Sequence, residues 1–223
     1  MKNIVTLSIL FLGIVLNYNA QKHQPGTFNV RLGGNAALGI TYVNGTVLNQ
    51  KAEEDTGGVL SMQIPFSVEY GLTNYLSVNA GFKTGSWLNE DPNDNSVEVI
   101  KKRITEVVLG FKLYAVNKDN FNLYLGYDFG YGGFQTEKEN TGLFLVKENQ
   151  KWTGVNNNIN LGMNWYYGGG FGSYFQLGYT GYKFNLKEYS LNNEDQMAPF
   201  EIEADMKVSG AQIELGFCYK FGN

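Results

Sequence analysis

The chain offers few side chains of the kinds that usually carry out catalysis. Among its 223 residues there is one histidine, His23, and one cysteine, Cys218. A single cysteine can form neither an intramolecular disulfide nor a cysteine-rich metal site. His23 precedes the regular part of the sequence, so we expect it outside the folded domain, which is left without a histidine general base. We expect Cys218 to fill space, and we predict no enzyme activity, no catalytic residue and no cofactor.

One segment resembles a cation-binding loop. Acidic and amide residues alternate from Asn89 to Asn95, a spacing similar to that of calcium loops. The segment lacks the glycine and the distal glutamate of an EF-hand. We therefore interpret it as a solvated turn and predict no metal site.

Composition favours tightly turned β structure. The chain has 28 glycines, 15 tyrosines and 15 phenylalanines but only 4 prolines. Aromatic side chains suit the pleated surface of a sheet, and glycine allows tight turns and close approaches. The net charge of -4 gives no indication of a nucleic-acid partner.

The N-terminus has the layout of an export signal. Lys2 is followed by an apolar run from Ile4 to Leu16 and then by a short polar stretch ending at Ala20. This run is short for a helix that spans a bilayer, and it matches the apolar region of a signal peptide. We predict a cleaved signal peptide over residues 1–20 and a short periplasmic segment over residues 21–27.

Residues 28–221 contain eight segments in which apolar and polar residues alternate. In the first, Phe28, Leu32 and Leu38 share one face, while Asn29 and Arg31 share the other. Period two is the pattern of a β-strand with two different faces. The other segments begin near residues 60, 76, 106, 121, 155, 174 and 211.

The connections alternate between short and long. Residues 71–74, 117–120 and 168–172 form tight turns, whereas residues 44–56, 88–97, 135–151 and 185–203 are long and polar. In an up-and-down barrel this order places all short turns at one rim and all long loops at the other. Short periplasmic turns and long extracellular loops are typical of outer-membrane barrels, and both termini are then periplasmic.

The polar face indicates that the apolar face contacts lipid. A water-facing surface would be rich in lysine and glutamate, but here the polar face consists mostly of Gly, Asn, Ser, Gln and Tyr, with about one charge per strand. Charges on the apolar face lie only near the long loops, where their cost in a membrane is small. These rim cations, which we expect to contact lipopolysaccharide phosphates, are Lys101, Arg103, Lys183 and Lys207.

The charges on the polar face nearly balance, which predicts a structural ion network inside the barrel. If residue 43 pairs with residue 57, antiparallel register places Arg31 opposite Glu69, and we predict an ion pair between them. Eight strands enclose a space that side chains just fill, so a general diffusion pore is not expected. The network consists of Arg31, Glu69, Lys83, Glu106, Lys112, Asp128, Glu214 and Lys220.

Two stretches resemble the small eight-stranded outer-membrane barrels typified by the OmpA transmembrane domain, OmpX and OmpW. They are Val68–Val78, which reads as strand, turn and strand, and the closing run Gly216–Phe221 with its alternating aromatics. The resemblance covers residues 28–221 and implies an all-β, eight-stranded antiparallel up-and-down transmembrane β-barrel in the bacterial outer membrane. It also implies recognition of the last strand by the barrel-assembly machinery. Enzymes among outer-membrane barrels use a histidine on the barrel, which this chain is not expected to have.

Three functions remain open at this point. The first is a structural or surface-interaction role, in which the extracellular loops meet lipopolysaccharide or a protein partner. The alternative, which the likeness to OmpW implies, is a narrow channel or carrier for small hydrophobic molecules. The third is a subunit of a larger outer-membrane complex.

Overall fold

The computed structural model describes residues 23–48, 50–51, 55–89, 97–140 and 146–222. The expected signal peptide and the acidic segment of residues 90–95 lie outside these residues. Within them, no helix is long and apolar enough to cross a membrane. The elements are the strands β1 (Phe28–Val47), β2 (Gln50–Lys51), β3 (Asp55–Gly71), β4 (Leu76–Asn89), β5 (Val97–Asn117), β6 (Phe121–Asn140), β7 (Val146–Gly168), β8 (Phe171–Leu191), β9 (Glu194–Asp195) and β10 (Glu203–Phe221), and the short helix α2 (Met197–Phe200).

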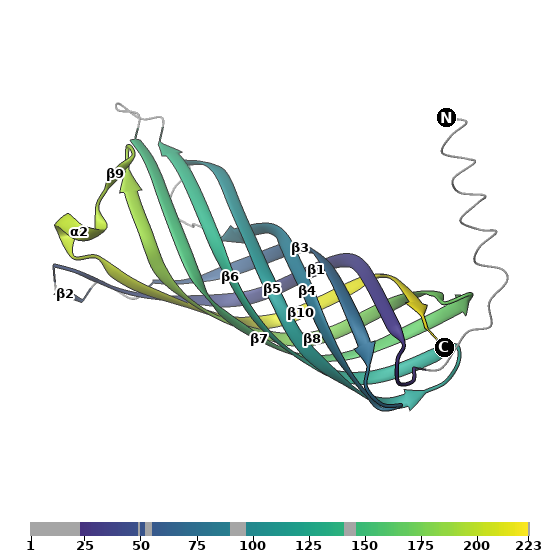
Figure 1. Cartoon of the computed structure of the whole chain (residues 1–223). Coiled ribbons are helices and arrows are strands. Elements are labelled where there is room, and N and C mark those ends of the chain that lie inside the picture. Colours follow the sequence, from purple (N-terminus) through teal and green to yellow (C-terminus); the bar gives the residue numbers. More distant parts are fainter. Residues whose placement is uncertain (1–22, 49, 52–54, 90–96, 141–145, 223) are drawn as a thin grey trace, which may run out of the picture.

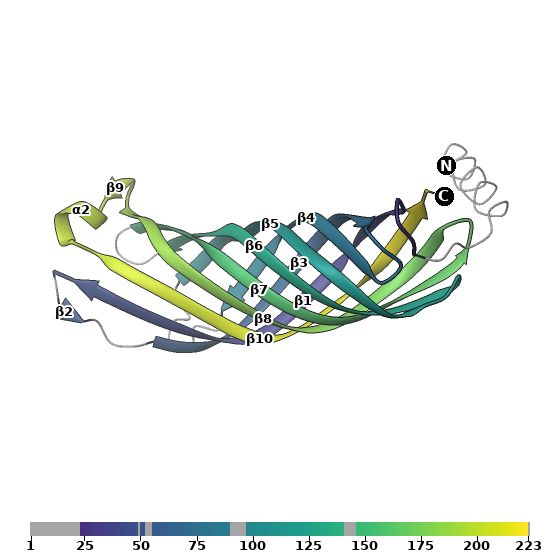
Figure 2. The ribbon, with the colours of Figure 1, turned by 60° about the horizontal axis from the view of Figure 1, so that its bottom comes forward.

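The eight long strands form a closed antiparallel ring. Each pairs with the next one along the chain, and β10 returns to pair with β1, so the sheet has no free edge. Figures 1 and 2 show the strands running obliquely around the barrel. Because Phe28 pairs with Phe221, β1 begins where β10 ends. The fold is the eight-stranded up-and-down barrel that the sequence predicts.

The two faces of each strand differ as the alternation indicates. On β1, Leu38 and Ile40 point outward and are 66% and 53% exposed, whereas Arg31 and Asn35 point inward and are buried. A band of exposed Leu, Ile, Val and Phe side chains surrounds the barrel in this way. Such an apolar exterior is favourable in contact with hydrocarbon, because exposing this much apolar surface to water would cost free energy.

Tight turns close the rim at which β1 begins, here called the short-turn rim. The most compact is the β7–β8 turn, in which Gly169 and Gly170 have φ angles of 58° and 80°. Two positive φ angles make a type I′ turn, which suits the right-handed twist of a hairpin and favours glycine. A Cβ on Gly170 would also collide with the carbonyl oxygen of Lys220.

The prediction of long loops at the opposite rim, here called the hairpin rim, was wrong in extent. The segment of residues 135–151 is strand up to Asn140 and again from Val146, and β8 continues to Leu191 before β9 and α2. Outward-facing residues in these stretches, such as Lys151 and Glu188, are polar, yet the backbones stay paired with the neighbouring strands. Pairing satisfies the backbone hydrogen bonds whatever the side chains are, so polarity alone does not end a strand.

Candidate functional site

All eight charged residues assigned to the network point into the barrel, and each is less than a tenth exposed. Arg31 Nη2 lies 3.2 Å from Glu69 Oε2, so the pair expected from the sequence is present. The predicted register between β1 and β3 was wrong by two residues, because Val43 pairs with Asp55 and Arg31 lies opposite Ser67. The long side chains of Arg31 and Glu69 still reach each other diagonally across the two strands.

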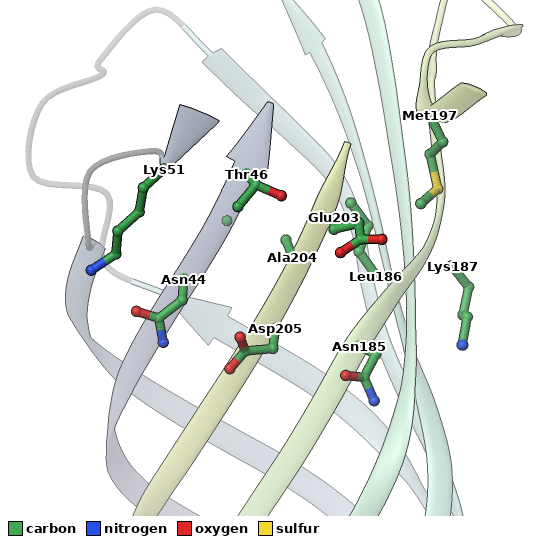
Figure 3. Close-up of a pocket in the computed structure, with 11 residues that line it drawn as sticks. Asn44, Thr46, Lys51, Asn185, Leu186, Lys187, Met197, Glu203, Ala204 and Asp205 are labelled. Carbon is green, nitrogen blue, oxygen red and sulfur yellow. The ribbon is translucent and has the colours of Figure 1, made fainter. Parts of the chain in front are cut away.

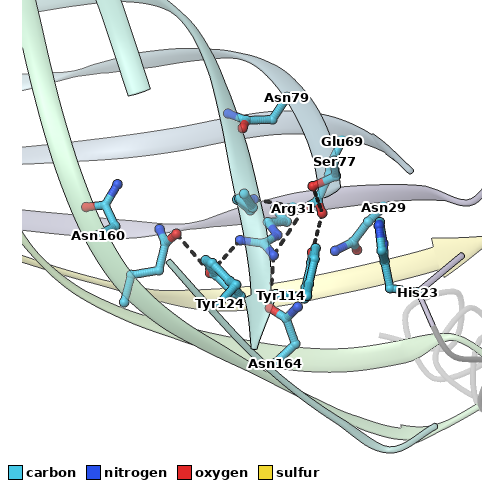
Figure 4. Close-up of polar contacts among 12 residues, drawn as sticks. His23, Asn29, Arg31, Glu69, Ser77, Asn79, Tyr114, Tyr124, Asn160 and Asn164 are labelled. Carbon is cyan, nitrogen blue, oxygen red and sulfur yellow. Dashed lines mark hydrogen bonds and ion pairs between the residues drawn. The ribbon is translucent and has the colours of Figure 1, made fainter. Parts of the chain in front are cut away.

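Glu69 is the centre of this network (Figure 4). Its carboxylate lies 2.8 Å from Lys112 Nζ and accepts hydrogen bonds from the Ser77 hydroxyl at 2.6 Å and from the Tyr114 hydroxyl. Two cations and two hydroxyls thus surround one carboxylate, which compensates for removing it from water.

Aromatic rings hold the Arg31 guanidinium. It donates to the Tyr124 hydroxyl at 2.8 Å and to Asn164 Oδ1 at 3.0 Å. The ring centroids of Tyr124 and Tyr174 lie 5.0 and 5.1 Å from its central carbon, within cation–π range. These side chains fill the barrel interior near the short-turn rim.

A second, amide-rich layer lies nearer the middle of the barrel. Lys83 Nζ and Glu214 Oε2 are 3.7 Å apart. Asn79 and Asn160 each donate to the Asp128 carboxylate at 2.9 Å. The Glu106 carboxylate accepts hydrogen bonds from the side-chain amides of Gln63 and Asn156.

The expected position of His23 was wrong. The imidazole is buried in the mouth of the barrel at the short-turn rim, where it stacks on the Tyr114 ring with centroids 4.3 Å apart. The His23 backbone N–H donates to Asn117 Oδ1 at 2.9 Å, and backbone hydrogen bonds join Gly26 and Thr27 to Gly71. The segment before β1 therefore closes this rim, a role that its sequence did not indicate.

Lys220 and Cys218 lie near the same rim. Lys220 Nζ sits 4.0 Å above the Tyr166 ring centroid, and Cys218 is buried beside Tyr166 and Tyr174. Among the described residues, no group of three or more histidine, cysteine, aspartate or glutamate side chains is arranged to hold a metal ion.

The barrel interior changes character towards the hairpin rim. There the inward-facing side chains are apolar and packed together, and Trp87 and Ile104 are almost completely buried. Trp87 contacts the rings of Phe134, Tyr182 and Phe184 at centroid distances of 5.4, 5.4 and 6.0 Å. We call the following buried residues the aromatic core: Val59, Trp87, Ile104, Phe134, Trp152, Tyr182, Phe184, Leu186, Met206 and Val208.

The aromatic core lies at the level where the outside of the barrel becomes polar. On β5, Val107 and Leu109 are exposed apolar residues, whereas Arg103, further towards the hairpin rim, is an exposed cation beside inward-facing Ile104. Towards the hairpin rim the inner face of the wall thus changes from polar to apolar, and the outer face changes from apolar to polar. We call this change the exchange of faces. Where the outer face is polar, a polar interior would leave both sides of the wall suited to water, and an apolar interior instead stabilises the barrel as it does a soluble one.

The wall between β1 and β3 contains an interruption. Leu32 pairs with Phe66 and Asn35 with Gln63, but Gly33 and Gly34 are not paired with the intervening Pro65 and Ile64. Proline has no N–H to donate, which removes a hydrogen bond from a sheet. A cavity of about 20 Å³, room for about one water molecule, lies beside Pro65 and is bounded by Phe66 and the inward-facing Lys83 and Glu214.

A smaller cavity lies directly beneath the aromatic core. It has a volume of about 10 Å³ and is lined by Trp87, Val59 and Ser61, together with the paired Gly39 and Gly210. Two glycines facing each other leave the space that side chains fill elsewhere. Along β3 the inward-facing residues therefore run from the aromatic core past this cavity to Pro65 and the interruption.

The predicted rim cations do not form one cluster. Lys183 and Lys207 are exposed and pair directly across β8 and β10. Arg103 is exposed on β5, where its neighbours are Ser86 and Gln135. The side chain of Lys101 lies outside the described residues.

An open groove of about 820 Å³ crosses the hairpin rim (Figure 3). It runs between the ends of β1, β8 and β10, with α2 on one side. Carboxylates, amides and lysines line it together, and the Met197 side chain faces it from α2. Its lining includes Asn44, Thr46, Lys51, Asn185, Lys187, Met197, Glu203 and Asp205.

Solved structures share this fold. The crystal structure of the outer membrane protein OprG from Pseudomonas aeruginosa matches with a TM-score of 0.61 at 15% identity, covering 90% of this chain and 98% of OprG. The chain has the fold of a small outer-membrane β-barrel. The solid-state NMR structure of outer membrane protein AlkL in lipid bilayers matches this barrel with a TM-score of 0.56 at 14% identity, covering 93% of this chain and 96% of AlkL. No protein-family model and no curated protein sequence matches the chain.

Proposed function

We propose that this outer-membrane barrel takes up small apolar molecules at its hairpin rim and releases them sideways, through the wall between β1 and β3, into the membrane. The observation that carries the proposal is the aromatic core inside the barrel, where a polar lumen is usual. Packed Trp, Phe and Tyr rings attract apolar compounds and offer little to sugars or ions.

The inward face of β3 supplies the path. Val59 belongs to the aromatic core, Ser61 lines the small cavity beneath it, and Pro65 stands at the interruption. An apolar molecule that displaced the core rings would follow this face for six residues and would have to displace the Gln63 amide from Glu106 before it met the weakened wall. At the interruption it would pass from the barrel interior to hydrocarbon, where its transfer is favourable.

A straight passage to the other rim is much less favourable. The molecule would have to displace Arg31 and Lys112 from Glu69 and then the segment around His23. Separating buried charges costs several kcal/mol, and an apolar molecule offers no compensating hydrogen bond. The same network would block ions and hydrophilic solutes.

The proposed direction requires the hairpin rim to face the cell exterior and both termini to face the periplasm. Short turns on the periplasmic side and long hairpins outside are the usual orientation of bacterial outer-membrane barrels. Transfer of this kind needs no catalytic residue and no cofactor, and we propose neither.

Uptake by cells tests the proposal. Gram-negative cells producing the wild-type protein should take up radiolabelled naphthalene faster than cells with an empty vector. Pro65→Val restores a backbone N–H at the interruption and should return uptake towards the vector level. Ile64→Val, an outward-facing neighbour that changes no backbone donor, serves as the matched control and should leave uptake unchanged.

Two results would contradict this function. One is naphthalene uptake equal to that of the vector control when heat-modifiable gel mobility shows a folded wild-type barrel. The other is steady ion conductance by the refolded wild-type protein in planar bilayers, which would indicate an open aqueous pore instead.

The groove at the hairpin rim supports a second candidate, a surface-interaction role. Its volume lies within the range of ligand sites, and its mixed charges and amides suit a polar partner such as a glycan. Binding of producing cells to immobilised glycans tests this role. Lys187→Gln with Glu203→Gln should abolish such binding without altering naphthalene uptake, and unchanged binding would count against it. Co-purification of a partner in mild detergent would favour the third function, a subunit of a larger complex.

A further inference from the structure

Two lysines face each other on the outer wall of the barrel. Lys183 on β8 and Lys207 on β10 are direct partners in the antiparallel register, and both side chains are exposed. Directly opposed residues have Cβ atoms about 4.5–5.5 Å apart, and like charges at this distance destabilise a sheet. An arrangement that is unfavourable by itself becomes favourable when an anion lies between the two ammonium groups.

Within the described part of the chain, neither lysine forms an ion pair. Lys151 at the same rim differs, because its Nζ lies 2.7 Å from Glu188 Oε1. The nearest outward-facing groups along β8 and β10 are Asn185 and Asp205, a pair one step nearer the hairpin tips. The side of the two lysines that faces the membrane carries no acid.

The neighbours of the two lysines are of the kinds expected at the depth of lipid headgroups. Tyr42, the partner of Lys207 on β1, stands in the same row and is 47% exposed. Two rows closer to the middle of the barrel, Tyr179 and Leu38 belong to the exposed apolar band. Tyrosine is enriched where hydrocarbon meets headgroups, and a charge near this level costs little.

A shallow notch lies between the lysines and the apolar band. The intervening row consists of Gly181 and Ser209 on β8 and β10, with Ile40 beside them on β1. A Cβ built on Gly181 would meet no atom within 4 Å, so the outer wall is open at this point. Two small residues between Tyr179 and Ile40 leave space in which an acyl chain can lie against the strands.

We propose that Lys183 and Lys207 bind the phosphate of an outer-leaflet glycolipid, with one of its acyl chains in the notch at Gly181 and Ser209. Phosphate oxygens accept hydrogen bonds from both ammonium groups, which removes the repulsion between the lysines. The acyl chain adds apolar contact with Ile40 and Tyr179. Arg103, on β5, is too far around the ring to take part. This inference rests on the orientation given under the proposed function, with the hairpin rim at the cell exterior, but it does not depend on the uptake of apolar molecules.

Native mass spectrometry of the detergent-solubilised full barrel tests the site, with bisphosphorylated and dephosphorylated lipid A as probes. The wild-type protein should retain the phosphorylated form. Lys183→Gln with Lys207→Gln should weaken its binding by about tenfold or more, since a charged hydrogen bond is worth at least that factor. Lys147→Gln with Lys151→Gln removes the same charge from the same rim and should leave binding unchanged.

The notch and the source of the phosphate have their own tests. Gly181→Leu fills the notch without changing charge and should weaken lipid A binding several-fold, with heat-modifiable mobility confirming that the variant barrel is folded. Equal retention of dephosphorylated lipid A, or unchanged binding by the Lys183 and Lys207 double variant, would overturn the proposal. Binding of inorganic phosphate alone at the same concentration would assign the lysines to a free anion and overturn the lipid assignment.

Discussion

Replacing Glu69 by glutamine would test whether the ion network holds the barrel together. Glu69→Gln preserves the size of the side chain but leaves Arg31 and Lys112 without a counter-charge in a buried site. With an effective dielectric constant of 20, the attractions across 3.2 and 2.8 Å amount to about 5 and 6 kcal/mol before desolvation. Much of this is offset by the cost of burying the charges.

The net loss is set by the cations that remain buried. Removing one partner of a buried pair destabilises proteins by about 3–5 kcal/mol, so the ratio of folded to unfolded protein should fall by more than two powers of ten. Urea-induced unfolding of the refolded barrel, followed by tryptophan fluorescence and by heat-modifiable mobility, would measure the change in the free energy of unfolding.

Glu188→Gln is the matched control. It makes the same chemical change in the exposed ion pair with Lys151, which should contribute at most about 1 kcal/mol. If Glu69→Gln lowered the free energy of unfolding no more than Glu188→Gln, the network would not stabilise the barrel. The ion network would then also not be what keeps the barrel interior closed near the short-turn rim.

Three further predictions concern other parts of the barrel. Burial lowers the pKa of His23 below its usual value of 6.5, as do the Lys112 and Lys220 charges, while Glu69 acts in the opposite direction. The contacts of the buried neutral imidazole are therefore stable above pH 6.5 and weaken as the pH falls. The hydrogen-exchange protection factors of residues 23–27, which correct for the intrinsic pH dependence of exchange, should fall in acid, and His23→Phe should remove this fall. Gly162→Ala places a methyl group against the Tyr124 ring and should lower the free energy of unfolding by about 1–3 kcal/mol in urea titrations, whereas no change would show that the ring moves freely. Trp87→Ala should cost about 3–5 kcal/mol through the cavity it leaves, and a loss below about 1 kcal/mol would mean that the aromatic core is loosely packed.

The sequence predicted the barrel and the direction of its faces because alternation with period two survives through every membrane-spanning strand. All eight network residues point inward for that reason. The exact register did not follow from the sequence, since the short strand β2 pairs with the end of β1 and Val43 pairs with Asp55, two residues away from the expected position. The prediction of the Arg31–Glu69 pair was still correct, because long side chains reach diagonal neighbours.

Other features left a weaker signal. The aromatic core alternates too, but its apolar residues occupy the face that is polar nearer the short-turn rim. When a single polarity is assumed for each strand, Phe134 and Trp152 therefore fall outside the predicted strands and border the loop predicted over residues 135–151. The position of His23 depends on a long-range stacking contact with Tyr114 that no local pattern encodes. Pro65 could have been noticed, since proline within an alternating strand indicates a missing ladder hydrogen bond.

The exchange of faces along the strands fixes how deeply the barrel sits in its bilayer. If the bilayer rose by two residues along the strands, Lys183 and Lys207 would enter hydrocarbon; if it sank, Tyr179 and Leu38 would meet water. The rigid interior leaves little freedom to compensate by bending, so a membrane of different thickness would have to adapt to the protein. We therefore expect the barrel to be best accommodated where the bilayer matches the height of its exposed apolar band.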